Sequence, residues 1–152
     1  MNTSEAGRAF IERNEGCRLD AYRDIVGVLT IGYGCTGRDV HEGMTITQAE
    51  ADQMLRDRLA HDFEPSVNHV IGNAPTTQGQ FDAMVSLAYN IGVGGFAKSS
   101  VLREHKAMNY EAAAAAFVMW NKAGGRVVRG LTRRRQEEAQ TYIDASPEHP
   151  GA

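Results

Sequence analysis

Residues 15–34 read E-G-C-R-L-D-A-Y-R-D-I-V-G-V-L-T-I-G-Y-G, and the rest of the chain is arranged around them. From Val26 to Gly34 the stretch is β-rich and punctuated by glycines, which predicts one or two short strands after a turn near Asp24. Two carboxylates, Glu15 and Asp24, and the hydroxyl of Thr30 are therefore carried by a helix end, a turn and a hairpin. Such elements hold polar side chains in place beside an open cleft.

The segment before this stretch predicts a short helix that runs to about Asn14. Asn2 or Thr3 can cap its start, and Gly16 is a natural stop. Glu15 is expected just past the last turn. After the hairpin, residues 38–45 are expected to form either a third short strand or a loop.

Two capping boxes mark helices in the remainder of the chain, one opening at Thr47 and one at Thr77. The first helix should break or kink near Pro65. The second, which runs to about Ile91, is apolar on most sides and is expected to be the central core helix. Further expected features are helices over 98–108 and after a cap at Asn109, a loop at Gly124-Gly125, a last helix over 132–143 and a frayed tail over 146–152.

These elements predict an α+β, mostly helical fold with one domain spanning residues 1–152. Its small β-lobe covers about 15–60. Its larger helical lobe covers about 66–145 and includes the N-terminal helix. A cleft is expected between the two lobes.

Charge is unevenly distributed along the 152 residues. The net charge is −3, yet residues 1–64 carry −5 and residues 65–152 carry +2. The positive charge of residues 65–152 is explained either by a polar, anionic partner or by ordinary variation of the protein surface. The negative total and the lack of aromatic residues interleaved with the basic ones argue against a nucleic-acid partner.

The chain has two cysteines, Cys17 and Cys35, which form no disulfide framework and no metal site by their spacing. They are expected to be reduced. The first sixteen residues contain no apolar core typical of a signal peptide, and the longest apolar run is too short to cross a membrane. We therefore expect a protein made in the cytosol, without stable membrane insertion.

Glu15, Asp24 and Thr30 form the sharpest chemical constellation. Glycoside hydrolysis needs a proton donor for the leaving oxygen and a second group for the water or the cation. A Glu at a helix end beside apolar side chains suits the role of proton donor, and a Thr hydroxyl can hold the attacking water molecule. The alternative is purely structural, with Glu15 as a surface helix end, Asp24 as a turn former and Thr30 as a strand residue.

The Glu15-x8-Asp24-x5-Thr30 spacing followed by I-G-Y-G is similar to the signature of the phage-type lysozymes, the endolysins of glycoside hydrolase family 24. The resemblance continues in L-A-Y-N-I-G-V-G-G-F-A-K-S-S-V-L (87–102) and W-N-K-A-G-G-R-V-V-R-G-L-T-R-R-R (120–135). It thus covers nearly the whole chain in the same order. One departure is Cys35, where this family often has His, and that puts local packing in doubt more than the reaction.

The resemblance implies a lysozyme-like fold and hydrolysis of the β-1,4 bond between N-acetylmuramic acid and N-acetylglucosamine in peptidoglycan. Glu15 would be the general acid, Asp24 would position or activate water, and Thr30 would help to hold it. The resemblance also implies inversion at the anomeric carbon, and no metal or cofactor. An enzyme of this family would act as a monomer and stay in the host bacterial cytoplasm until a holin releases it to the wall.

Sugar contacts are expected from residues whose aromatic, amide or hydroxyl groups suit pyranose rings, namely Tyr89, Asn90, Phe96 and Ser100 or its neighbour Ser99. Core packing is the alternative for Tyr89 and Phe96. Arg126 is a further substrate contact among five clustered arginines (Arg126, Arg129, Arg133, Arg134 and Arg135), whose expected partners are Glu15, another acidic group or the anionic wall. A solvated basic face is the alternative.

Two other functions fit the same residues. The first is an inactive module that binds peptidoglycan. The second is another glycan-cleaving reaction, either chitin hydrolysis or lytic transglycosylation. Lytic transglycosylation needs one catalytic Glu and leaves a 1,6-anhydro end.

Overall fold

The computed structural model describes residues 1–144, so the frayed tail expected over 146–152 lies outside the described residues. The fold is α+β and mostly helical, as predicted. Its elements, in order, are α1 (Glu5–Glu15), β1 (Arg18–Arg23), β2 (Leu29–Gly32), α2 (Gln48–Arg58), the π-helical turn η1 (Leu59–Phe63), α3 (Glu64–Ile71), α4 (Gln78–Ile91), α5 (Val93–Ala97), α6 (Ser100–Lys106), α7 (Tyr110–Phe117), the 3-10 turn η2 (Val118–Trp120), β3 (Lys122–Ala123), β4 (Arg126–Val127) and α8 (Arg129–Asp144).

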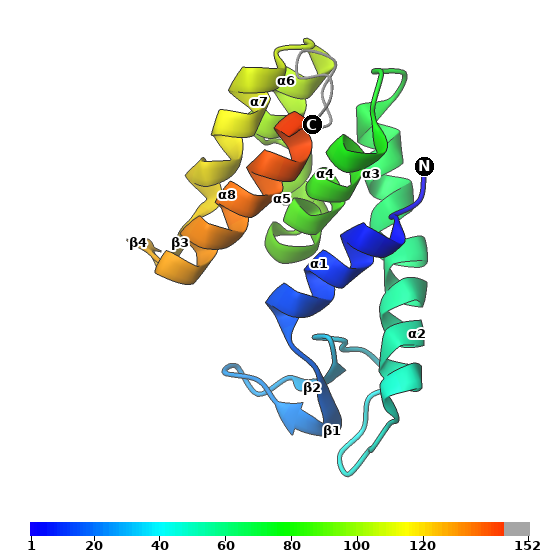
Figure 1. Ribbon diagram of the computed structural model, residues 1–152. Coiled ribbons are helices and arrows are strands. Elements are labelled where there is room, and N and C mark those ends of the chain that lie inside the picture. The colour runs from blue at the N-terminus through cyan, green and yellow to red at the C-terminus, as the bar shows by residue number, and fades with distance from the viewer. Residues whose placement is uncertain (145–152) are drawn as a thin grey trace.

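Helices α2 and α3 form one long column that links the two ends of the molecule (Figure 1). The β1–β2 hairpin lies at one end of this column, and helices α4 to α8 gather around the other end. Helix α1 leads from the helical group down to the hairpin. One hydrophobic core joins the parts, because it runs without a break from Ile31 and Ile46 to Phe117 and Tyr142.

Helix α4 is the centre of this core. The capping box at Thr77 is formed by its side chain and that of Gln80, and the box at Thr47 is formed likewise for α2. Nine successive residues of α4, from Gln80 to Ala88, are buried, because α1, α3 and α8 pack around it. Both capping boxes and the central helix are confirmed.

The start of α1 differs from the prediction. Ser4 is the cap, and its hydroxyl accepts a hydrogen bond from the Gly7 N–H at 3.1 Å while also donating to Asp82. Helix α1 then includes Glu15 as its last residue. Asp82 of α4 accepts from both the Ser4 N–H and the Ser4 hydroxyl, a contact between distant parts of the chain that the sequence does not reveal.

No clean break occurs at Pro65. The chain passes through the π-helical turn η1 and continues as α3, with Pro65 in the first turn. Proline has no N–H to donate to the preceding turn, and the wider π-helical turn before it is where the helical column accommodates this loss. Residues 38–45 form a loop, apart from an isolated bridge between Asp20 and Thr45.

The segment after α7 was expected to be a plain loop and instead forms a second hairpin. Strands β3 and β4 pair antiparallel across Gly124 and Gly125, whose φ angles are 58° and 78°. Two successive positive φ angles make the tight turn that suits a two-residue hairpin. Helix α8 therefore starts at Arg129, earlier than predicted. Within residues 1–144, no helix is both long and apolar enough to cross a membrane.

A buried histidine predicts acid sensitivity. His105 is completely buried, with Nδ1 2.6 Å from Tyr142 Oη and Nε2 2.9 Å from Thr76 Oγ1. Burial lowers the pKa of His105 to about 4, so the unfolded chain binds more protons on acidification. The free energy of unfolding is therefore unaffected above about pH 6.5, the ordinary pKa of histidine in the unfolded chain. Below that pH it falls, by roughly 3 kcal/mol at about pH 4.

Urea unfolding of the wild type and of His105→Gln across this range measures the effect. The variant should lose less stability between neutral and acid pH than the wild type. Equal losses in the two proteins would show that His105 is not responsible. His61→Gln, at an exposed histidine, is the matched control.

Candidate active site

Glu15 is fixed at the point where α1 ends and the hairpin begins. Gly16, with φ at 70°, stops the helix, and its N–H donates to the carbonyl oxygen of Glu12 at 3.0 Å. The Glu15 side chain is 21% exposed, and its Oε1 accepts a hydrogen bond from Arg134 Nη1 at 2.8 Å. One face of the carboxyl group is therefore held by α8, while part of the group remains open to solvent.

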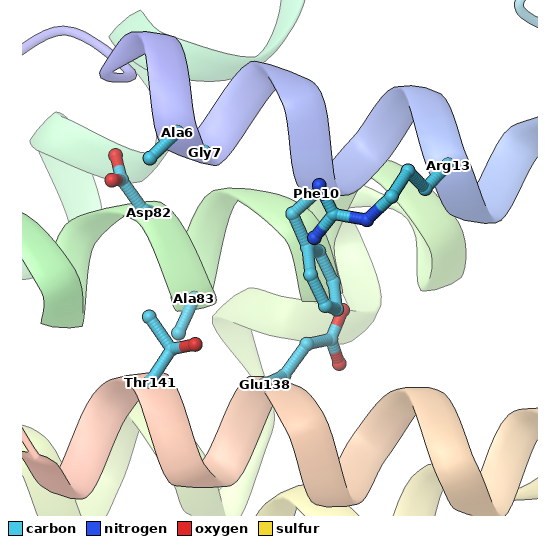
Figure 2. Close-up of a pocket in the computed structure, with 8 residues that line it drawn as sticks. All are labelled: Ala6, Gly7, Phe10, Arg13, Asp82, Ala83, Glu138 and Thr141. Atoms are coloured by element: carbon cyan, nitrogen blue, oxygen red, sulfur yellow. The ribbon is translucent and has the colours of Figure 1, made fainter.

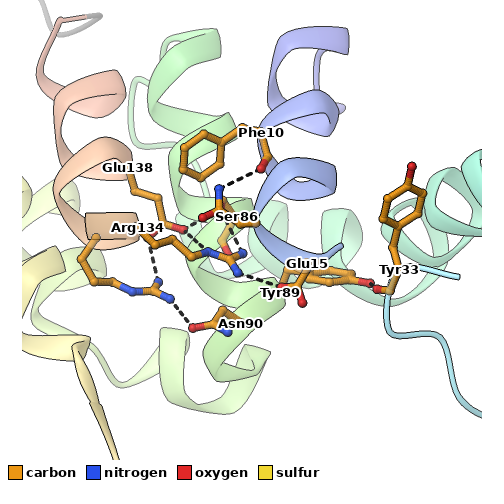
Figure 3. Close-up of polar contacts among 10 residues, drawn as sticks. Phe10, Glu15, Tyr33, Ser86, Tyr89, Asn90, Arg134 and Glu138 are labelled. Carbon is orange, nitrogen blue, oxygen red and sulfur yellow. Dashed lines mark hydrogen bonds and ion pairs between the residues drawn. The ribbon is translucent and has the colours of Figure 1, made fainter. Parts of the chain in front are cut away.

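Arg134 is itself held by a buried network (Figure 3). Its side chain is 5% exposed, and its Nη2 donates to the carbonyl oxygen of Ser86 at 3.2 Å. Its Nε lies 3.3 Å from Glu138 Oε2. Because these bonds fix the guanidinium group on several sides, Arg134 presents Nη1 to Glu15 in one orientation.

Glu138 balances two guanidinium groups. Its Oε1 accepts from Arg135 Nη1 at 2.7 Å, and its Oε2 accepts from Ser86 Oγ at 2.5 Å as well as from Arg134. Burial raises the pKa of Glu138, and the guanidinium groups of Arg135 and Arg134 oppose that shift. With Glu15 included, two buried cations face two carboxylates, so the network is close to neutral.

Asp24 closes the turn between β1 and β2. Its Oδ1 accepts from the N–H groups of Val26 and Val28, at 3.0 and 2.8 Å, and its carbonyl oxygen accepts from the Gly27 N–H. Oδ2 has no hydrogen-bond partner in the part of the chain that the structure describes. The backbone thus orients the carboxylate and leaves one oxygen available for a water molecule.

Thr30 lies on β2, paired with Tyr22 of β1 in the antiparallel register. It is 4% exposed, and its Oγ1 donates to the carbonyl oxygen of Val28 at 2.9 Å. With its proton engaged there, the hydroxyl oxygen can accept a hydrogen bond from water. The hairpin carries both Asp24 and Thr30, and Glu15 lies three residues before its first strand.

Tyr89 of α4 contacts the segment that follows β2, and Cys35 lies in that segment. Tyr89 Oη donates to the carbonyl oxygen of Tyr33 at 2.6 Å, and its ring lies 5.0 Å from that of Phe63. Burial raises the pKa of Tyr89 and also that of Cys35, whose shift the nearby Arg58 opposes. Cys35 is 4% exposed, so it packs in the interior where this family often has His.

The residues expected to contact sugars are dispersed. Phe96 is completely buried, so its ring offers no face to a sugar and the core-packing alternative applies. Ser100 lies on α6, at the other end of the molecule from the β1–β2 hairpin (Figure 1), and accepts from Arg103 Nη2. Asn90 is exposed and its Oδ1 accepts from Arg135 Nη2, while Arg126 lies exposed on β4.

The network residues Arg134, Arg135, Glu138 and Ser86 are the functional positions that sequence reasoning missed or left unassigned. Arg134 was one of five candidates to pair with Glu15, and 119 positions separate the two. The only local signal was the spacing of Arg134 and Arg135 to Glu138, at i,i+4 and i,i+3, which places the three side chains together on a helix.

A cavity of about 200 Å³ lies behind the network, between α1, α4 and α8. Figure 2 shows Phe10 and Arg13 on one side of it and Glu138 and Thr141 on the other. None of the three candidate catalytic residues lines it, so this cavity is separate from the site at Glu15. Among residues 1–144, no group of His, Cys, Asp or Glu is arranged to hold a metal ion.

Comparison with known proteins places these features in a family. The "Phage lysozyme" family model matches residues 12–138. The endolysin of Bacillus phage B103 is 40% identical over 145 residues, which are 94% of this chain but 54% of the relative. The chain thus spans little more than half the length of that endolysin.

Two further comparisons cover whole proteins. The endolysin of Salmonella phage P22 is 42% identical over 143 residues, which are 91% of this chain and 97% of that protein. A crystal structure of a P22 lysozyme mutant superposes with a TM-score of 0.84 at 40% identity, covering 94% of this chain and 99% of that one. The chain belongs to the phage lysozyme family.

Proposed function

We propose that this protein is an endolysin, a muramidase that hydrolyses the β-1,4 bond between N-acetylmuramic acid and N-acetylglucosamine in bacterial peptidoglycan. The observation that carries the proposal is the fixed Glu15 carboxyl group, which Arg134 holds directly before a hairpin bearing Asp24 and Thr30. The names of the relatives, endolysin and lysozyme, support the same reaction.

In the proposed reaction Glu15 donates its proton to the glycosidic oxygen as the bond from that oxygen to the anomeric carbon breaks. A water molecule held by Thr30 and the free Oδ2 of Asp24 attacks the same carbon from the opposite face. Its proton passes to Asp24, and the configuration inverts. The carboxylate left on Glu15 is stabilised by Arg134, whose guanidinium group is already in contact with it.

Among the expected sugar contacts, Tyr89 and Asn90 remain in the proposal. Both lie at the end of α4, and Tyr89 contacts the backbone of Tyr33 just beyond β2. With Oδ1 of Asn90 engaged by Arg135, its amide nitrogen is left to donate to a sugar.

We further propose a setting for this activity. The enzyme acts as a monomer, since one chain supplies Glu15, Asp24 and Thr30. It remains in the host bacterial cytoplasm, away from its substrate, until a holin lets it reach the wall. Its similarity to phage endolysins supports this order of events.

Asp24→Asn tests the proposed role of the turn. The asparagine Oδ1 can still accept from Val26 and Val28, so the turn should be kept, but the group can no longer take a proton from water. We expect lysis of permeabilised Gram-negative cells, followed by turbidity, to slow by about 10²-fold or more.

Asp20→Asn, at an exposed carboxylate on the preceding strand β1, is the matched control and should lyse at the wild-type rate. Full activity of the Asp24 variant would rule out a role for this carboxylate in the reaction. A wild-type protein that binds the cells without clearing them would instead support the inactive binding module.

A further inference from the structure

A tight turn follows Thr30 in the chain. The N–H of Ile31 donates to the carbonyl oxygen of Cys35 at 2.9 Å, and the N–H of Cys35 donates back to the carbonyl oxygen of Ile31, also at 2.9 Å. These two bonds close residues 31–35, which we call the β2 turn. Because Ile31 is bonded into this turn, the placement of Thr30 beside it depends on where the turn lies.

The side chain of Tyr33 ties the β2 turn to helix α2. Tyr33 Oη donates to Asp52 Oδ1 at 3.1 Å and accepts a hydrogen bond from Gln48 Nε2 at 2.9 Å. Both partners lie on α2, which extends to the hairpin end of the molecule (Figure 1). These bonds hold the turn to α2 and do not fix its distance from α4.

Tyr89 of α4 makes the contact from the helical side. Its Oη donates to the carbonyl oxygen of Tyr33 at 2.6 Å. Its ring centroid lies 5.0 Å from that of Phe63 and 5.8 Å from the guanidinium carbon of Arg58. Arg58 Nη1 also donates to the carbonyl oxygen of Gly34 at 3.4 Å. Because neighbours fix the Tyr89 ring, its hydroxyl meets the β2 turn at one position.

Helix α4 also holds the other half of the candidate site. The carbonyl oxygen of Ser86 accepts from Arg134 Nη2, and Arg134 Nη1 donates to Glu15 (Figure 3). Tyr89 lies three residues after Ser86, so the two residues are neighbours on one face of the helix. A single helix therefore has one path of contacts to the proton donor and a second path to Thr30.

We propose that the Tyr89 hydroxyl is a positioning group for the reaction. By holding the β2 turn against α4, it keeps the Thr30 hydroxyl, and the water bound there, in register with Glu15. The inference rests on the proposed function, which gives Thr30 and Glu15 their roles. It gives Tyr89 a task beside the sugar contact of its ring. A misplacement of about 1 Å can cost about 10²-fold in rate, so one hydrogen bond at this junction can affect kcat.

Tyr89→Phe tests this role, because it removes the hydroxyl and keeps the ring that the proposed function assigns to the sugar. We expect kcat for the release of reducing ends to fall by about 10-fold, with KM nearly unchanged. In a protein that already carries Thr30→Ala, the same substitution should lower kcat by less than about 2-fold. A group that acts through Thr30 has little left to position once the Thr30 hydroxyl is gone.

Tyr142→Phe is the matched control, since it also removes a tyrosine hydroxyl with a short contact, 2.6 Å from His105 Nδ1. It should lower the unfolding temperature about as much as Tyr89→Phe does and leave kcat unchanged. A wild-type protein that releases no reducing ends would refute the proposed function itself. In an active enzyme, three results for Tyr89→Phe would overturn the positioning role alone: an unchanged kcat, a rise in KM without a fall in kcat, or an equal loss of kcat with and without the Thr30 hydroxyl.

Discussion

Glu15→Gln is expected to lower kcat for peptidoglycan hydrolysis by about 10³-fold with little change in stability. The amide has no proton to donate to the leaving oxygen, and general acid catalysis is typically worth about 10²–10⁴-fold. The carbonyl oxygen of the introduced amide can still accept from Arg134 Nη1, so the end of α1 should keep its place. Release of reducing ends measures kcat, and thermal unfolding measures stability.

Glu12→Gln is the matched control, one turn earlier on the same helix, and should retain wild-type activity. If Glu15→Gln kept more than about a tenth of wild-type kcat, Glu15 could not be the essential proton donor. A loss of activity accompanied by a large drop in unfolding temperature would identify a structural role instead.

Glu138→Ala is expected to destabilise the protein by about 3–5 kcal/mol, the range found when one partner of a buried ion pair is removed. Its side chain is fully buried, and without it the charges of Arg134 and Arg135 are balanced only by Glu15. The urea midpoint measures this loss. Glu137→Ala, at the exposed neighbouring position, should cost less than about 0.5 kcal/mol.

A second expected effect links Glu138 to catalysis. Arg134 loses one of the groups that orient it, so the part of the variant that remains folded should have a reduced kcat and a nearly unchanged KM. A stability loss below about 1 kcal/mol would contradict the network as described. A rise in KM without a fall in kcat would contradict the positioning of Glu15 through Arg134.

Local signals predicted the local structure well. The capping boxes at Thr47 and Thr77 were correct because each is complete within four residues. The turn near Asp24 and strand β2 were correct, because glycines and β-branched residues specify them directly. Strand β1 (Arg18–Arg23) was missed, since the strands were expected only from Val26 to Gly34. The β3–β4 strands were missed because each has only two residues, too few for a periodic pattern.

The candidate site was only partly predictable. Local spacing singled out Glu15, Asp24 and Thr30, and the structure shows which contacts hold each of them. Local spacing could not identify Arg134, since the pairing with Glu15 depends on how α8 packs against α1 and α4. Nor could it separate surface from core in the Gly-rich segment after α4, which is why Phe96 was expected to contact sugars although it is completely buried.

The products formed in water enriched in heavy oxygen test most directly whether the protein hydrolyses peptidoglycan. Peptidoglycan digested by the wild type should yield muropeptides ending in reducing N-acetylmuramic acid, each carrying one heavy oxygen at the anomeric carbon. Mass spectrometry of the separated products reads this label. Products ending in 1,6-anhydro-N-acetylmuramic acid, without the label, would contradict hydrolysis and show a lytic transglycosylase.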